Sequence, residues 1–219
     1  MDRGNRMLEK IAILYHKAQM GIISGLSGTS SGVIEEANFY DVGYMQTQIS
    51  RVQKELKRIT GEIETTLELK DTSDYGKKQL SGLMEQREQL LYRMVFLASN
   101  SFKNLDYCMN LAEGYPFVFM QCVKALQEYD TGNKEKAFVH LESYYKEHGS
   151  VEEHYLVNKV FGLLLAERGQ YKKAVLFLTY ALQFMPDDIE SLNTLKMCYR
   201  KLNETGKERV ISEILAVLG

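Results

Sequence analysis

Two stretches of this chain repeat apolar residues with the alternating 4–3 spacing of a heptad. The first stretch, within residues 40–68, contains Met45, Ile49, Val52, Leu56, Ile59 and Ile63. The second contains Leu80, Met84, Leu91 and Met94 and continues to Ala98 and Leu105, with Arg87 and Ser101 as polar interruptions. Such spacing keeps one seam of a helix facing a partner helix. The sequence therefore predicts two long helices, over 40–68 and from about Ser73 to Leu111.

The connection between these two helices is short and polar. Residues 69–77, LKDTSDYGK, combine Asp, Ser and Gly, which favour a turn. A short turn between long helices predicts an antiparallel hairpin. A further helix is expected upstream, from Arg6 to Ile23, followed by a loop in the Gly/Ser-rich residues 24–32. Gly114, Tyr115 and Pro116 should break the second long helix, so we expect domains at 1–113 and 116–219.

The composition favours an all-α protein. Only two of 219 residues are proline, and stretches rich in Leu, Glu, Lys, Gln and Met are good helix formers. With 45% hydrophobic and 26% charged residues, the chain resembles an ordinary globular protein that can bury a core. The fold expected is an N-terminal helix and a long coiled-coil-like hairpin, followed by a series of helix pairs.

Charge and cysteine content argue against several classes of protein. The net charge is −2 with both signs interspersed, whereas binding to nucleic acid needs clustered Lys and Arg. Cys108, Cys122 and Cys198 are odd in number and widely spaced, which indicates buried thiols in a reducing compartment. Residues 11–26 are too short and too polar to span a membrane, and no cleavage pattern follows them. We therefore expect a cytoplasmic protein without membrane insertion.

Residues 155–188 contain small residues and turn residues in a characteristic order. Gly162, Ala174 and Ala181 are the small residues, Gly169 and Tyr171 mark a turn, and Pro186 follows the second helical run. In these positions the segment resembles one tetratricopeptide repeat, a 34-residue unit of two antiparallel helices. The resemblance implies that the small residues lie where the two helices touch. It also implies that the unit stacks on neighbouring units to form a binding surface.

Weaker copies of this pattern flank residues 155–188. Gly132 and Ala137 precede Gly169 and Ala174 by 37 positions, which places three extra residues near Glu147–Gly149. The first unit, about 117–150, has Tyr144 in place of the second-helix alanine. The third, about 189–218, keeps Leu192, Leu195 and Tyr199 but ends in a helix of capping type. The resemblance thus covers about 100 of the 219 residues and implies a solenoid of about three helix pairs.

The resemblance also implies which side chains line a concave groove, because the first helix of each pair faces inwards. The first row is Phe119, Cys122, Leu126 and Tyr129; the second is Leu156, Lys159 and Leu163; the third is Asn193, Met197 and Arg200. An apolar floor suits an amphipathic helix or an extended segment, and Lys159 and Arg200 would meet an acidic group. The alternative is that the apolar members pack against the N-terminal hairpin. A chaperone-type carboxylate clamp does not fit, since Leu163 stands where Asn is needed.

No catalytic or cofactor-binding constellation is visible in the sequence. His148 and His154 occur with three glutamates in residues 147–154, but their spacing matches no metal motif. Residues 25–32, GLSGTSSG, lack the lysine of a phosphate-binding loop. We therefore predict a non-enzymatic protein without metal or cofactor.

The function expected from these patterns is that of an adaptor or scaffold. Its concave face would bind a helical or extended segment of a protein partner, and the hairpin would offer a second contact or a homodimer seam. One alternative is a secretion or assembly chaperone that holds a specific client. Another is a regulator that changes shape when it binds a peptide. An architectural resemblance alone does not separate these functions.

Overall fold

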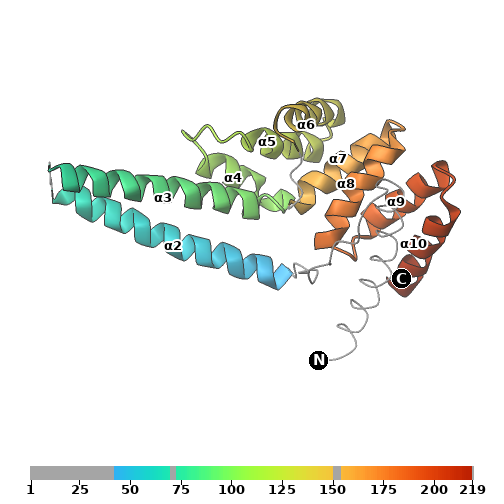
Figure 1. Cartoon of the computed structure of the whole chain (residues 1–219), viewed down its shortest axis with the longest axis horizontal. Helices are drawn as coiled ribbons and strands as arrows, with labels where there is room; N and C mark the ends of the chain where they lie inside the picture. Colours follow the sequence, from blue (N-terminus) through green and yellow to red (C-terminus); the bar gives the residue numbers. More distant parts are fainter. Residues whose placement is uncertain (1–41, 70–72, 150–153, 219) are drawn as a thin grey trace, which may run out of the picture. The chain divides into compact units, whose positions relative to one another are not determined.

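The computed structural model describes residues 42–69, 73–149 and 154–218, and every regular element in these ranges is helical (Figure 1). The expected helix at 6–23 and the loop at 24–32 lie outside the described residues. The elements are α2 (Val42–Glu68), α3 (Asp74–Ala98), the 3-10 helix η1 (Phe102–Asn104), α4 (Leu105–Leu111), α5 (Met120–Asp130), α6 (Lys134–His148), α7 (Tyr155–Glu167), α8 (Tyr171–Phe184), α9 (Ile189–Lys201) and α10 (Thr205–Leu218).

The chain divides into two compact units, one of residues 41–140 and one that includes residues 141–219. We call them the 41–140 unit and the 141–219 unit. The division falls inside α6, which contributes its first half to one unit and its second half to the other. Residues 114–116, where the domain boundary was expected, form a turn between α4 and α5. That expected boundary stays a prediction.

In the 41–140 unit, α2 and α3 pack side by side along most of their lengths. Ile59, Ile63 and Leu83 form a buried cluster, with Leu80 and Leu90 packed against it. Five further members of the predicted seam are buried or half-buried, namely Ile49, Val52, Leu56, Leu91 and Met94. Met45 lies in α2, but its side chain is not described.

Met84 departs from the predicted seam. Its side chain is 52% exposed, whereas the neighbouring Leu83 is buried. Residues three and four positions along a helix both lie near the starting face, so Leu83 and Met84 were both compatible with a seam that begins at Leu80. In the folded protein Leu83 packs in the cluster with Ile59 and Ile63, so the contact with α2 selects Leu83 and leaves Met84 exposed.

The predicted helix from Ser73 to Leu111 was wrong as a single element, because α3 ends at Ala98. Three consecutive polar residues, Ser99, Asn100 and Ser101, follow that end. The Ser99 hydroxyl and the Asn100 amide both donate to the carbonyl of Phe96, and the Asn104 amide donates to the carbonyl of Ala98. Side chains of this kind offer the backbone an alternative to continued helix. The chain resumes helical structure in η1 and α4.

The 141–219 unit is built around α7, which is buried on all sides over most of its length. Gly162 lets α8 approach closely, because a Cβ atom placed there would lie 2.8 Å from Cγ of Leu178. Gly169 has φ +71° and turns the chain between the two helices, a conformation that glycine adopts readily. The helices α9 and α10 pack against each other, and α8 also contacts α9.

Aromatic side chains join α6 to this core. The Tyr145 ring stacks on Phe161 at 4.7 Å between centroids, and Phe177 lies 4.7 Å from Tyr145 and 4.8 Å from Phe161. The Tyr145 hydroxyl donates to the amide oxygen of Asn158, which is itself fully buried. Such a satisfied polar contact fixes the rings relative to α7.

Candidate partner-binding surface

The first predicted groove row, on α5, is largely core of the 41–140 unit. Phe119, Cys122 and Leu126 are buried, and Tyr129 is half-buried. The helix α5 packs on α4 and η1, where the Tyr129 ring stacks on Phe102 at 6.1 Å between centroids. The Gln127 amide donates to the Asp106 carboxylate at 2.7 Å. This row is therefore covered by the polypeptide itself, as in the self-packing alternative.

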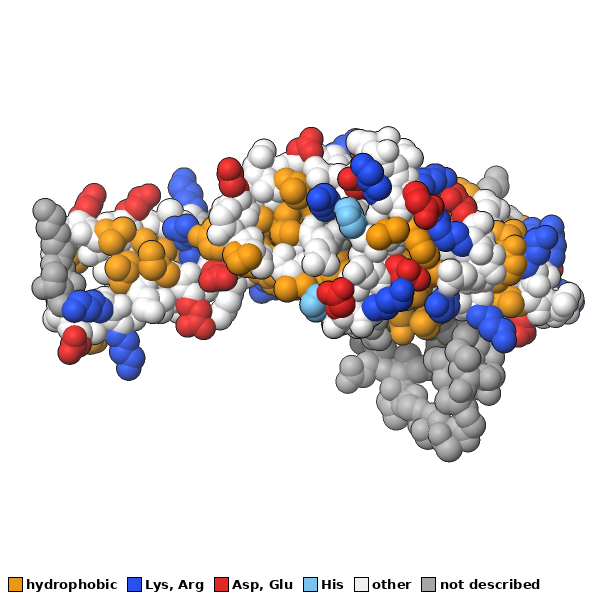
Figure 2. Space-filling view, turned by 90° about the horizontal axis from the view of Figure 1, so that it is seen from above, with side chains coloured by type: hydrophobic (Ala, Val, Ile, Leu, Met, Phe, Trp, Pro, Cys, Tyr) orange, Lys and Arg blue, Asp and Glu red, His pale blue; other side chains and the backbone are white. Residues whose placement is uncertain are grey.

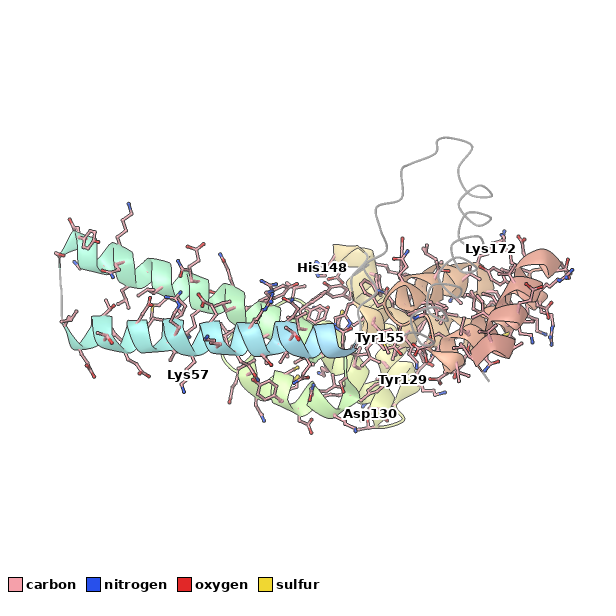
Figure 3. All side chains as sticks on the ribbon, turned by 90° about the horizontal axis from the view of Figure 1, so that it is seen from below. Lys57, Tyr129, Asp130, His148, Tyr155 and Lys172 are labelled. Atoms are coloured by element: carbon pink, nitrogen blue, oxygen red, sulfur yellow. The ribbon has the colours of Figure 1, made fainter. Side chains whose placement is uncertain are left out.

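The second row, on α7, is also closed. Leu156 and Leu163 are both buried, so neither offers an apolar surface to a partner. Sequence patterns place such residues on the inner helix of a pair, but they do not reveal which side chains of the folded protein cover them. Figure 3 shows Tyr155 at the start of α7 and Lys172 at the start of α8, at opposite ends of this pair.

Lys159 is engaged within the protein rather than free to meet a partner's carboxylate. Its ammonium group lies 2.9 Å from Oδ1 of Asp188 and 2.9 Å from Oε2 of Glu190. The side chains of Lys159 and Asp188 are only 13% and 11% exposed. Asp188 also accepts a hydrogen bond from Ser191. The predicted role of Lys159 as an anchor for an external acidic group is therefore not supported by its surroundings.

The surroundings of Lys159 also shift its pKa. Burial disfavours the ammonium cation, but hydrogen bonds to Asp188 and Glu190 outweigh that penalty and raise the pKa of Lys159 above its ordinary value. Tyr155, whose ring lies 5.9 Å from the ammonium group, has a pKa raised by burial and by the negative charge of Asp188. Lys159 thus stays charged and Tyr155 stays neutral at physiological pH. The cluster joins α7 to the start of α9.

The third row is the part of the predicted groove that remains accessible. Asn193 and Arg200 are exposed and Met197 is half-buried. Ile189, one helical turn before Asn193, is 53% exposed and extends the same face. We call Ile189, Asn193, Met197 and Arg200 the α9 stripe. The Arg200 guanidinium pairs with Glu208 of α10 at 2.8 Å, so apolar and polar side chains alternate along the stripe.

Ile189 was missed by sequence reasoning because it directly follows the turn at Pro186–Asp188. A signal was present, since Ile189, Asn193 and Met197 are spaced by four residues. This spacing places them on one face of a helix once the start of that helix is known.

The described residues contain no group of three or more His, Cys, Asp or Glu side chains placed to hold a metal ion. His154 has a structural position, where its Nδ1 accepts a hydrogen bond from the backbone of Val157 and caps α7. The three cysteines are buried free thiols. Over the same ranges of the chain, every helix is too short or too polar to cross a bilayer.

No family model matches this chain, and comparisons with curated proteins and with solved structures found no similar protein. The tetratricopeptide resemblance therefore rests on the residue pattern of 155–188 and on its weaker copies.

Proposed function

We propose that the protein is a non-enzymatic adaptor that binds a helical or extended segment of a partner protein on the α9 stripe. In this proposal α5–α6, α7–α8 and α9–α10 are three tetratricopeptide-like units and α2–α3 is an antiparallel hairpin. Helix pairs at the expected positions support the interpretation, since the turns at Gly132 and Gly169 both have positive φ. The binding face is narrower than the sequence suggested.

The observation that carries this proposal is the exposure of the α9 stripe beside an otherwise closed core. Ile189 and Met197 supply apolar contact area, and Asn193 supplies hydrogen-bonding groups between them. Protein interfaces combine apolar contacts with hydrogen bonds, and a few side chains carry most of the binding energy. A partner helix with two or three apolar anchors would match such a stripe.

The test is a pull-down from lysate of the source organism that compares wild type with Met197→Asp. Leu176→Asp serves as the matched control, because Leu176 is an exposed apolar residue on α8 of the same unit. We expect one protein in stoichiometric amount that binds at least about tenfold more weakly to Met197→Asp and unchanged to Leu176→Asp. Circular dichroism of both variants checks that they fold. A partner held equally by all three proteins would refute the α9 stripe as its site.

A further inference from the structure

A second surface with the composition of an interface lies on the 41–140 unit. The segment that joins α4 to α5 carries Tyr115, Phe117 and Phe119, and it packs on the outer face of α3. The Tyr92 ring of α3 meets Phe117 edge-on at 5.6 Å and Phe119 at 6.3 Å between centroids. Tyr115 stacks on Phe117 at 5.5 Å. We call Met84, Tyr92, Tyr115, Phe117 and Val118 the aromatic platform.

Contacts of Phe119 and Arg87 hold the aromatic platform in place. Phe119 is fully buried and packs on Phe96 at 5.1 Å, which anchors the segment to α3. The Arg87 guanidinium donates to the Tyr115 hydroxyl at 2.6 Å and lies 6.0 Å from the centre of that ring. A rigid aromatic surface loses little conformational entropy when a partner binds, so its contact area contributes efficiently to affinity.

This platform is accessible to a partner. Met84, Tyr92 and Val118 are 52%, 41% and 48% exposed, while Tyr115 and Phe117 are half-buried. Figure 2 shows hydrophobic side chains gathered on the face of the α2–α3 pair that is turned towards the viewer. Tyr, Phe, Met and Arg are the residue types that are enriched at protein interfaces.

The charge around the platform indicates what it binds. Glu88 lies one helical turn from both Met84 and Tyr92, and Glu85 and Glu113 are also exposed. Glu88 has no ion-pair partner among the residues that the structure describes. Arg87 is turned to Tyr115, and Arg93 projects about 100° around α3 from Tyr92. The cation of this surface, Arg87, is thus engaged by Tyr115, whereas the exposed Glu88 carboxylate is left for a partner.

We propose that the aromatic platform binds a segment of a partner protein in which a lysine or arginine lies next to an apolar side chain. The cation would rest beside the exposed part of the Tyr92 ring and pair with Glu88, because the Tyr115 ring already contacts Arg87 and Phe117. The adjacent apolar side chain would cover Met84. This surface lies on the 41–140 unit and does not depend on the α9 stripe, so the two proposals succeed or fail separately.

The experiment uses a random-peptide phage library as the probe and the full-length protein as the bait. Selected peptides are then synthesised and titrated by fluorescence polarisation against wild type, Glu88→Lys and Glu64→Lys. Glu64 is an exposed glutamate on α2 of the same helix pair and provides a control of equal charge change. Met84→Asp tests the apolar contact, and circular dichroism checks the folding of each variant.

The expected result is enrichment of peptides with Lys or Arg beside an apolar residue. These peptides should bind about tenfold more weakly to Glu88→Lys and to Met84→Asp and unchanged to Glu64→Lys. The proposal is overturned if no such class is enriched or if the peptides bind Glu88→Lys as tightly as wild type. It is also overturned if sedimentation shows a dimer that Glu88→Lys dissociates, because the platform would then bind a second copy of the chain.

Discussion

Gly162 illustrates how one residue sets the distance between two helices. An alanine Cβ at this position would lie 2.8 Å from Cγ and 3.1 Å from the backbone nitrogen of Leu178. Because the backbone cannot move aside without separating α7 from α8, we predict that Gly162→Ala lowers the free energy of unfolding by about 1–3 kcal/mol. Denaturant unfolding measures this loss.

Gly61 in α2 is the control for that substitution, since a Cβ there meets no atom within 4 Å. Alanine is a better helix former than glycine, so Gly61→Ala should stabilise the protein by roughly 0.5–1 kcal/mol. Equal destabilisation by both substitutions would show that Gly162 has no special role in helix packing.

The buried thiols are expected to be unreactive in the folded protein. Burial raises the pKa of both Cys108 and Cys198 to about 11, and it raises that of Cys122 further. The thiolate is the reactive form, so native protein at pH 8 should be alkylated by iodoacetamide far more slowly than unfolded protein, with a rate that rises towards pH 11. Mass spectrometry of quenched samples follows each site.

The same shift makes stability depend on pH. The folded pKa of these thiols is raised, so their contribution to stability is fully present below the unfolded value of about 8.5. It is lost as the pH rises through about 11. Stability that increased between pH 9 and 11 would contradict the burial of these groups.

At the scale of the helices, sequence patterns predicted well those helix ends that are set by a glycine or a proline in the adjoining turn. Gly132 and Gly169 have positive φ at the turns between helices, and the second helical run of 155–188 ends before Pro186 as expected. The end of α3 at Ala98 was missed. The apolar heptad continues past Ala98, but Ser99 and Asn100 donate hydrogen bonds to backbone carbonyls where the helix ends. The spacing of apolar residues cannot reveal such hydrogen bonds.

The ion pairs of Lys159 connect elements that are distant in sequence, α7 and the start of α9. Lys159→Ala would leave Asp188, which is 11% exposed, without its cation, and we predict a loss of roughly 2 kcal/mol in the free energy of unfolding. Arg209→Ala removes the exposed pair with Glu213 and should cost less than about 0.5 kcal/mol. Chemical denaturation of both variants separates these outcomes, and similar costs would mean that Lys159 is no better paired than a surface residue.

At the scale of the whole molecule, the sequence predicted an all-helical protein but could not decide which apolar residues stay accessible. Leu126 and Leu163 have the residue type and the helical position of groove residues, yet both are buried. Burial depends on which helices become neighbours, and no periodicity within one helix encodes that. Met197 stays partly accessible, although it lies in the third unit, which is a weaker copy of the pattern in residues 155–188.

Because the chain divides into two compact units, a destabilising substitution in one unit is expected to increase hydrogen exchange in that unit alone. Ile59 is buried in the α2–α3 cluster, so Ile59→Ala should destabilise the 41–140 unit by about 2–4 kcal/mol. Hydrogen exchange monitored by mass spectrometry should then show faster exchange in α2 and α3 and little change in α7 to α9. Met84→Ala, at an exposed site of the same pair, should leave exchange unchanged. Faster exchange throughout the chain would mean that the two units unfold as one.

The helix α6 spans the division between these units, because residues 134–140 belong to one and residues 141–148 to the other. A fragment designed to begin at residue 141 would keep only the second half of α6, and one that stopped at residue 140 would keep only its first half. A fragment of either unit should therefore be designed to carry the whole of α6. A fragment of residues 155–188 alone would lack α6, and with it the Tyr145 ring that stacks on Phe161.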